Sequence, residues 1–299
     1  MIVIDPMAIK DANLVYTNVP EADYPAYSAA TTYAVDAYVI VVGVNNHKVY
    51  KSLVNNNTGN DPASSATKWL YMGSTNRWAM FDDSVGSQTT RADSISVQIS
   101  FNQLVDSIAL INISAAQADI TVTVPVDGVV YSKTISLIST AGITDIYRYW
   151  FWPVLRKTDF YLADLPPYAA GTISIVLSDA GATVKCGAMV IGQRFEIGAT
   201  QYGVRLGIDD YSDKTRNGFG QAQLVPRDYN RRGDFTMQLD AYQVEFAYQF
   251  LANCRARMMV WAGTTQYGPT LILGNYESFQ FEIQTAKTSI YTLSVKGLT

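Results

Sequence analysis

Charged residues are scarce in this sequence, and their scarcity narrows the range of partners. Asp, Glu, Lys and Arg make up 16% of the 299 residues, whereas about 25% is usual for a soluble domain. The net charge is −4, and the one short basic run, RDYNRR at residues 227–232, contains an aspartate. Because phosphate binding needs concentrated Lys and Arg, we expect no nucleic-acid partner and favour a solvated loop over a nucleic-acid patch at this run.

Histidine and cysteine are almost absent as well. His47 is the single histidine, and Cys186 and Cys254 are the two cysteines. One histidine cannot form a His-rich metal site, so we expect His47 to be a solvated turn residue. Two cysteines do not make a disulfide framework, so we expect both thiols to be free and buried. The HExxH, GxSxG, P-loop and dinucleotide-binding motifs are also missing. These absences predict a protein that is not an enzyme, with no catalytic residues and no cofactor.

No targeting or membrane-spanning segment is visible. The sequence has no run of about 18 apolar residues, the length that a membrane-spanning helix needs. Its N-terminus, MIVIDPMAIKD, lacks the basic start and apolar stretch of a signal peptide. We therefore expect a chain that is made in a cytoplasm and does not insert into a membrane.

What the sequence does have is tyrosine, with 20 residues, and short stretches of alternating polarity. A period of two with one apolar face is typical of strands in a sandwich. The alternating stretches between residues 78 and 195 are 94–100, 107–113, 119–124, 129–137, 172–177 and 184–191. Asp127-Gly128 is a strong hairpin signal between two of them. The pattern predicts a mainly β protein with a β-sandwich over residues 74–195, beginning at Trp78.

The first 25 residues predict an extended arm. A short apolar strand at 1–4 is followed by polar sequence that Pro6, Pro20 and Pro25 interrupt, and proline favours extended backbone. Such an arm either packs along its own domain or reaches onto a neighbouring subunit. Both alternatives remain open.

Residues 26–73 predict a small separate module. Strands are expected at 38–44 and 48–53, followed by a polar loop that closes at Trp69. About fifty residues make a small core, so aromatic side chains must supply much of it. The spacer at residues 73–76 is rich in small polar residues, and we expect it to act as a hinge that leaves the module mobile.

This module resembles the small chitin-binding type of carbohydrate-binding module. The matching residues are Tyr33, the strand pair over 42–53, the Asn-Thr-Gly at 57–59, Pro62 and Trp69. In that family exposed aromatic rings stack on sugars. The resemblance implies carbohydrate contact by Tyr50, Trp69 and Tyr71. A minimal core would use the same three residues for packing, so both interpretations are kept.

The sandwich resembles a discoidin-like, galactose-binding-like jelly roll. The similarity lies in its two ends, RWAMFDDSVGSQTT and VKCGAMVIGQRFEIG. That fold often carries a calcium ion, so the resemblance makes Asp82, Asp83 and Asp93 weak candidates for binding Ca²⁺.

One aromatic run inside the sandwich region, at residues 147–152, is too apolar for an ordinary solvated loop. It is either a buried strand whose alternate rings enter the core or a surface that meets another subunit. The candidate interface residues are Tyr147, Tyr149, Trp150 and Trp152.

Residues 196–299 change in character. Strand patterns at 203–208 and 234–239 precede a helical stripe over 240–257, and strands are expected again at 258–261, 271–281 and 289–296. The stripe consists of Val244, Ala247, Tyr248, Leu251 and Cys254. The order ββαβββ predicts an α+β unit with one helix across an antiparallel sheet.

This unit resembles the tail-tube-like domain of phage tube, distal-tail and baseplate proteins. In that family the sheets of neighbouring subunits join into a ring, and a long hairpin contacts the adjacent ring. The loop at 209–232 is long for a compact domain, and the resemblance places Arg227, Arg231 and Arg232 at a subunit interface.

The complete layout resembles a minor tail or baseplate protein of a tailed bacteriophage. It implies a structural virion protein, assembled in the host cytoplasm, that forms a homo-oligomeric ring with other tail proteins and contacts host-surface glycan weakly through many copies. The alternatives are a stand-alone carbohydrate-binding protein and a glycan-degrading enzyme, which needs a carboxylate pair across a cleft.

Overall fold

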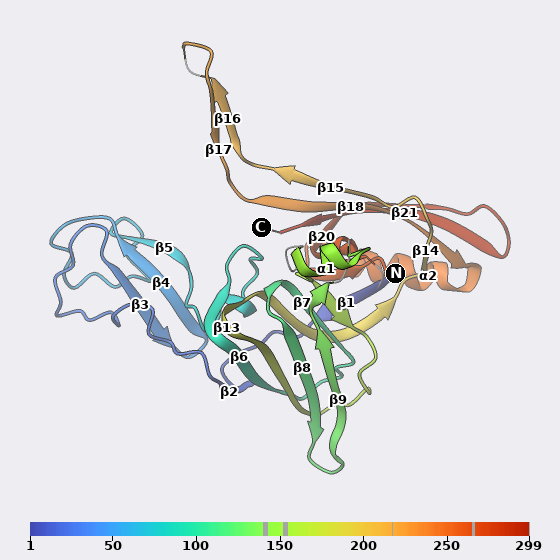
Figure 1. Ribbon diagram of the computed structural model, residues 1–299, viewed down its shortest axis with the longest axis horizontal. Coiled ribbons are helices and arrows are strands. Elements are labelled where there is room, and N and C mark those ends of the chain that lie inside the picture. The colour runs from blue at the N-terminus through green and yellow to red at the C-terminus, as the bar shows by residue number, and fades with distance from the viewer. Residues whose placement is uncertain (140–142, 152–154, 217, 265–266, 299) are drawn as a thin grey trace.

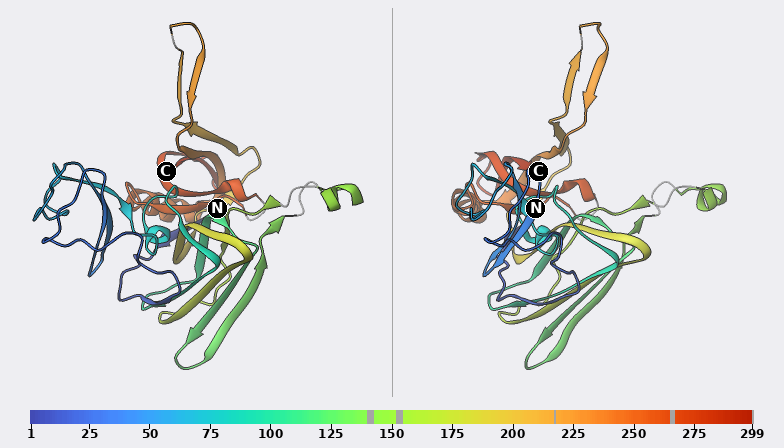
Figure 2. Two further views of the ribbon diagram at one scale, coloured as in Figure 1. Left: turned by 60° about the vertical axis from the view of Figure 1, so that its left-hand side comes forward. Right: turned by 90° about the vertical axis from the view of Figure 1, so that its left-hand side faces the viewer.

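The computed structural model describes residues 1–139, 143–151, 155–216, 218–264 and 267–298. The fold is mainly β, as the alternating patterns predict, with antiparallel sheets and little helix. A small module, a sandwich and a C-terminal sheet lie around a common centre (Figure 1), and two slender projections leave it, one ending in β16 and β17 and the other in α1 (Figure 2). No helix among the described residues is long and apolar enough to cross a membrane.

The strands of the first 139 residues are β1 (Ile2–Pro6), β2 (Leu14–Thr17), β3 (Tyr38–Gly43), β4 (Asn46–Ser52), β5 (Trp69–Ser74), β6 (Thr89–Phe101), β7 (Ser107–Ser114), β8 (Gln117–Val124), β9 (Gly128–Ser136) and β10 (Ile138–Ser139). Those that follow are β11 (Leu155–Arg156), β12 (Phe160–Leu162), β13 (Gly171–Glu196), β14 (Ala199–Thr200), β15 (Arg205–Asp210), β16 (Asp213–Arg216), β17 (Ala222–Val225), β18 (Tyr229–Asp240), β19 (Met259–Ala262), β20 (Leu271–Glu282) and β21 (Thr288–Gly297). The helices are α1 (Ile146–Phe151) and α2 (Val244–Asn253), with 3-10 turns η1 (Ala79–Phe81), η2 (Ala241–Gln243) and η3 (Gly268–Thr270).

β13 is the longest strand, and the sandwich is built on it. The two strands predicted at 172–177 and 184–191 are halves of this one strand of 26 residues. The prediction of a break between them is wrong, because a register shift between Ser178 and Thr183 absorbs the irregularity. One edge of β13 pairs with β6, and the other pairs first with β8 and then with β7.

The remaining sandwich strands confirm the predicted pattern. β6, β7 and β8 contain the stretches predicted for them, and β9 covers its predicted stretch except Leu137. β9 begins at Gly128, whose positive φ of 72° suits the predicted hairpin turn. Alternate side chains along β6 and β13 are fully buried in the largest apolar cluster. They are Ile95, Val97 and Ile99 on β6, and Ile173, Ile175 and Leu177 on β13.

The N-terminal strand β1 lies inside the sheet of its own chain. It pairs with the end of β13 on one side and with β19 on the other, so that Ile2 faces both Glu196 and Ala262. Ile4 is fully buried in an apolar cluster that joins residues of the sandwich to residues of the C-terminal sheet. Of the two alternatives for the N-terminal segment, the structure therefore supports packing along its own chain.

The C-terminal sheet has the strand order β1-β19-β20-β21-β18, and all these pairs are antiparallel. The predicted helix is present as η2 followed by α2. Ala247, Leu251 and Cys254 of the predicted stripe are buried. Tyr248 is half-exposed instead and packs edge-on against Phe279 of β20, with 5.7 Å between the ring centroids.

The predicted long loop at 209–232 is a β-hairpin. β15 pairs with the first half of β18, and the hairpin continues into β16 and β17, which pair with each other. We call residues 211–228 the arm; it projects far from the body (Figure 1). β15 pairs with β18 along one edge, and its other edge pairs with no strand among the described residues.

β1 lies so close to β13 at Gly192 that only glycine fits at this position. A Cβ atom at this position would lie 2.0 Å from the backbone oxygen of Asp5, which cannot move without breaking the ladder. We expect Gly192→Ala to reduce the free energy of unfolding by about 3 kcal/mol, the upper end of the range for overpacking. Urea denaturation measures this change.

Gly43→Ala is the matched control, because nothing lies within 4 Å of a Cβ atom there. Equal stability of the two variants would show that β1 does not pack as described.

Candidate functional site

The small module is a three-stranded sheet, β3-β4-β5, with an aromatic core. Trp69 is 2% exposed, and its indole N–H donates a hydrogen bond of 2.9 Å to the backbone oxygen of Asn60. Tyr50 is 6% exposed and belongs to the same cluster. A ring that stacks on sugar must present its face to solvent. For Trp69 and Tyr50 the structure therefore supports the packing alternative.

Tyr71 is the predicted sugar-contact residue that the fold leaves accessible. Its side chain is 52% exposed and meets Tyr50 edge-on at 5.9 Å. The Lys48 ammonium lies 5.6 Å from the centre of the Tyr71 ring. A second aromatic pair, Tyr24 stacked on Tyr38 at 4.9 Å, also borders the module. The sequence analysis missed this pair because Tyr24 lies in the segment assigned to the N-terminal arm.

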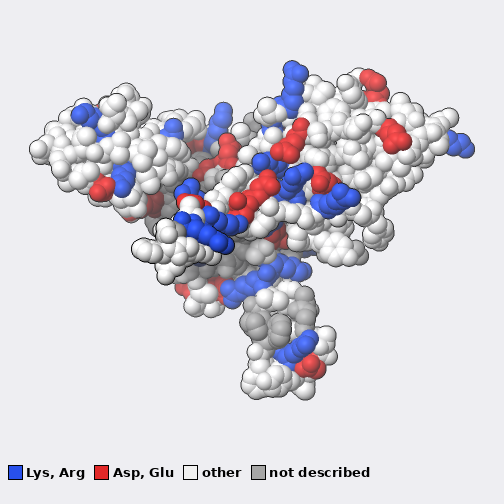
Figure 3. All heavy atoms as spheres, turned by 90° about the horizontal axis from the view of Figure 1, so that it is seen from above, with Lys and Arg blue, Asp and Glu red and all other residues white. Residues whose placement is uncertain are grey.

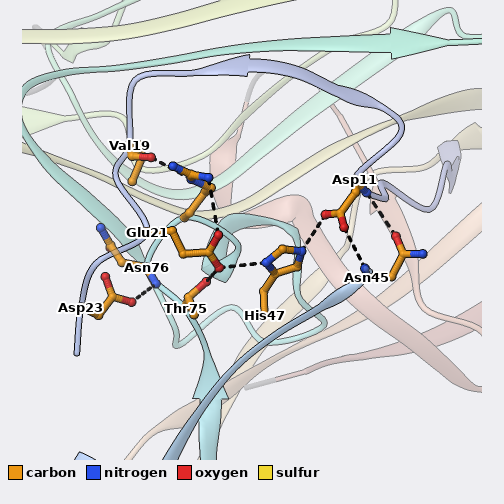
Figure 4. A network of polar contacts seen from close by, with 9 residues as sticks. Asp11, Val19, Glu21, Asp23, Asn45, His47, Thr75 and Asn76 are labelled. Carbon is orange, nitrogen blue, oxygen red and sulfur yellow. Dashed lines mark hydrogen bonds and ion pairs between the residues drawn. The ribbon is translucent and has the colours of Figure 1, made fainter. Parts of the chain in front are cut away.

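The module is fastened to the body through His47, and the prediction of a solvated turn residue is wrong. The imidazole Nδ1 lies 2.8 Å from Glu21, and Nε2 lies 2.6 Å from Asp11 (Figure 4). The ring stacks on Trp78 with 4.3 Å between centroids. The imidazole therefore lies between two carboxylates, with one at each ring nitrogen.

The spacer between the module and the sandwich is held on both sides, and the prediction of a hinge is wrong. The hydroxyl of Thr75 donates to Glu21 at 2.8 Å, and the backbone N–H of Asn76 donates to Asp23 at 2.6 Å (Figure 4). The Asn76 side chain also donates to the backbone oxygen of Thr90 on β6. We call the contacts of His47, Glu21, Asp11 and these spacer residues the latch.

The pKa of Asp11 reflects its place in the latch. Partial desolvation disfavours its charged form, but the N–H of Asn45 and the imidazole of His47 outweigh this and hold the pKa below its usual value. The carboxylate of Glu21 is additionally approached by Arg77 at 3.5 Å. The latch thus joins charges from the N-terminal segment, the module and the spacer.

We expect His47→Ala to loosen the junction and leave the module folded, since His47 is not part of the module's aromatic core. A side-chain hydrogen bond to a charged group contributes about 1.5–3 kcal/mol, so opening should become at least about tenfold more frequent. The rate of tryptic cleavage at Arg77 measures it. The pKa of Asp11 is lower in the folded protein than in the unfolded chain. Asp11 therefore stabilises the junction fully above about pH 3.9, the ordinary pKa of aspartate, and this stabilisation is lost as the pH falls further.

Lys51→Ala is the control, because the Lys51 ammonium pairs with Asp36 at the surface of the module itself. If both variants are cleaved at the wild-type rate, the latch does not hold the module.

The arm and its base carry a mixture of exposed apolar and charged side chains. The side chains of four apolar residues are between 44% and 69% exposed: Leu206 and Ile208 on β15, Leu224 on β17 and Tyr229 on β18. Charged side chains gather over the middle of the molecule when it is seen from above (Figure 3). The prediction of a solvated loop at 227–232 is wrong, because most of this basic run lies in β18, which begins at Tyr229.

The three arginines predicted at an interface differ in their surroundings. Arg227 and Arg232 are exposed and lie 4.0 Å from Asp213 and Asp234. Arg231 instead donates to Asp159 of the sandwich at 2.9 Å. The Asp159 carboxylate is buried and also accepts the backbone N–H of Asn112 at 3.0 Å. Arg231 therefore joins the base of the arm to the sandwich.

A groove of about 830 Å³ runs between the sandwich and the base of the arm, with the Asp159–Arg231 pair in its wall. Its apolar lining comes from both sides and includes Leu206, Ile208, Tyr229, Tyr161 and Tyr267. Sequence reasoning missed this groove, because its walls are far apart in the chain.

Residues 147–151 of the aromatic run belong to the short helix α1, which lies beyond the paired strands β10 and β11 (Figure 2). We call these two strands the stalk and α1 the tip. Tyr147, Tyr149 and Trp150 are 70%, 68% and 72% exposed. The alternative of a buried strand is therefore wrong for these residues. Trp152 lies outside the described residues.

The predicted calcium candidates do not converge. Asp82 accepts hydrogen bonds from Ser84 and Ser87, and burial raises its pKa. Asp93 accepts the backbone N–H of Gly181 at 2.9 Å. Within the part of the chain that the structure describes, no three His, Cys, Asp or Glu side chains are grouped as metal ligands. Asp83, the third candidate, therefore belongs to no such group either.

Both cysteines are free and buried, as predicted. Burial raises the pKa of Cys186 to about 12 and that of Cys254 to about 11. Such thiols are protonated at neutral pH and have little thiolate to act as a nucleophile.

No protein-family model matches this chain, and no curated protein matches it.

Proposed function

We propose that this chain is a structural protein of a tailed-bacteriophage virion, part of the tail tip or baseplate. In this proposal the C-terminal sheet and its arm join copies of the chain into a closed homo-oligomeric ring that contacts other tail proteins. The small module, on the outside, contacts neighbouring subunits or host-surface glycan. The protein acts by assembly and has no catalytic role.

The observation that carries the proposal is the arm and the strand edge at its base. β15 is paired with β18 on one side only among the described residues, and an open edge is a template for a strand of another chain. Around this edge, apolar side chains such as Ile208, which is 62% exposed, remain in solvent in the isolated chain. Burying them against a second copy would stabilise an assembly.

Glycan binding is the second candidate, and Tyr71 favours it. The exposed ring with Lys48 beside it offers one face for stacking and a neighbouring donor for hydroxyl groups. A single ring gives weak binding, which a ring of many modules would strengthen through avidity.

Replacing the arm, residues 211–228, by an Asn-Gly turn tests the ring. Asp210 and Tyr229 are already opposite each other in the ladder, so a two-residue turn can join them. We expect the shortened chain to fold as wild type and to lose closed rings in native mass spectrometry and electron microscopy.

The control is deletion of residues 26–73, which removes the module and should leave the rings intact. If the wild-type chain is monomeric in every setting, including intact particles, the proposed function is wrong.

For the glycan candidate, we expect Tyr71→Ala to abolish any signal on a glycan array without changing the melting temperature of the module, because the side chain is exposed. Tyr202→Ala, at an exposed ring outside the module, is the control. A glycan signal that survives Tyr71→Ala would place sugar binding elsewhere.

A further inference from the structure

The tip at α1 exposes more apolar surface than a short surface helix needs. Ile146, Tyr147, Tyr149, Trp150 and Phe151 are each between 68% and 79% exposed. Tyr147 contacts Phe151 at 4.8 Å, and Tyr149 contacts Trp150 at 5.8 Å, so the rings pack on one another. Exposed aromatic groups of this size mark contact surfaces.

The tip lies away from the body of its own chain, beyond the stalk strands β10 and β11 (Figure 2). In the view from above, the tip stands apart from the main mass of the molecule (Figure 3). The tip is therefore accessible to another molecule.

The groove described above reaches the root of the stalk. Ser139 and Arg156, which belong to the two stalk strands, line it. Opposite them lie Ile208, Tyr229 and Tyr267, whose side chains are 62%, 52% and 60% exposed. The volume of about 830 Å³ falls within the range that encloses a ligand of several rings.

We infer that the aromatic tip of one copy occupies the groove of a neighbouring copy. This inference rests on the proposed function, because it requires that copies of the chain assemble. It identifies which two surfaces meet.

The chemistry of the two surfaces is complementary. The groove wall holds Arg156, Lys157 and Arg231, of which Arg231 pairs with Asp159 in the wall and Arg156 pairs with Asp179. The tip offers the faces of tyrosine and tryptophan rings, which attract a cation placed within about 6 Å of the ring centre. The apolar rings Tyr229 and Tyr267 supply partners for the rest of the aromatic surface.

The position of the groove favours a second copy over an unrelated partner. Leu206 and Ile208 of the groove belong to β15, the strand with the open edge. A copy that adds a strand at this edge is thereby brought beside the groove. A contact between two different patches of one chain can repeat from copy to copy, which is how rings close. The tip is small, so it would act as the anchor of a larger interface.

The test uses one variant of each surface in the full-length chain. Tyr149→Ala combined with Trp150→Ala removes the anchor, and Ile208→Asp places a charge in the apolar groove. Because all three side chains are exposed, both variants should melt at the wild-type temperature. Each should raise the concentration for half-maximal assembly by about thirtyfold, the effect of losing an interface hot spot.

Mixing the two variants supplies the decisive readout. Each pair of unlike molecules retains one intact tip and one intact groove, so the equimolar mixture should form a one-to-one complex in native mass spectrometry that neither variant forms alone. Matched controls are Tyr242→Ala and Val126→Asp, at exposed positions on η2 and in the turn between β8 and β9; both should assemble as wild type.

Wild-type assembly by both variants would overturn the inference and leave the proposed ring standing. Loss of glycan binding by Ile208→Asp with rings intact would also overturn it, since the groove would then be a sugar site. Absence of any oligomer of the wild-type chain in solution and in particles would overturn the proposed function itself.

Discussion

The backbone ladder that β1 forms with β13 on one side and β19 on the other is the interaction on which the rest of the structure depends. It joins the sandwich and the C-terminal sheet into one continuous sheet. Ile4 of β1 is buried among side chains from both. Gly192 permits the contact, since any Cβ atom there would meet the backbone of Asp5. Without this strand the two larger cores would face each other across an unpaired edge.

Three parts of the chain extend from the sheet joined in this way: the small module, the arm and the aromatic tip. The latch of His47 with Asp11 and Glu21 sets the small module against the sandwich. The arm extends from an open sheet edge, and the Arg231–Asp159 pair ties its base to the sandwich. The aromatic tip leaves from strands that line the groove under that arm. Projections that carry exposed apolar side chains suit the proposed assembly of this protein with copies of itself.

Much of the fold follows from local patterning. Alternation along β6, β7, β8 and β9 predicts strands because each places one face in the sandwich core, and the stripe of α2 predicts the helix for the same reason. The break expected inside β13 does not occur, because β6 pairs with both halves of the strand, on either side of the register shift between Ser178 and Thr183. The candidate sites are less predictable. Tyr50, Trp69 and Tyr71 share one pattern of aromatic residues, and only packing separates the two buried rings from the exposed one.

The sequence by itself determined the mainly β class, the strands with one apolar face, the α2 helix and the burial of both thiols, because these depend on residues close together in the chain. Only the tertiary structure decided that β1 packs in its own sheet, that His47 lies between Asp11 and Glu21, and that a groove joins Tyr161 to Tyr229. These features depend on residues brought together from distant segments. Backbone pairing and close packing select such contacts, and neither periodicity nor composition records them.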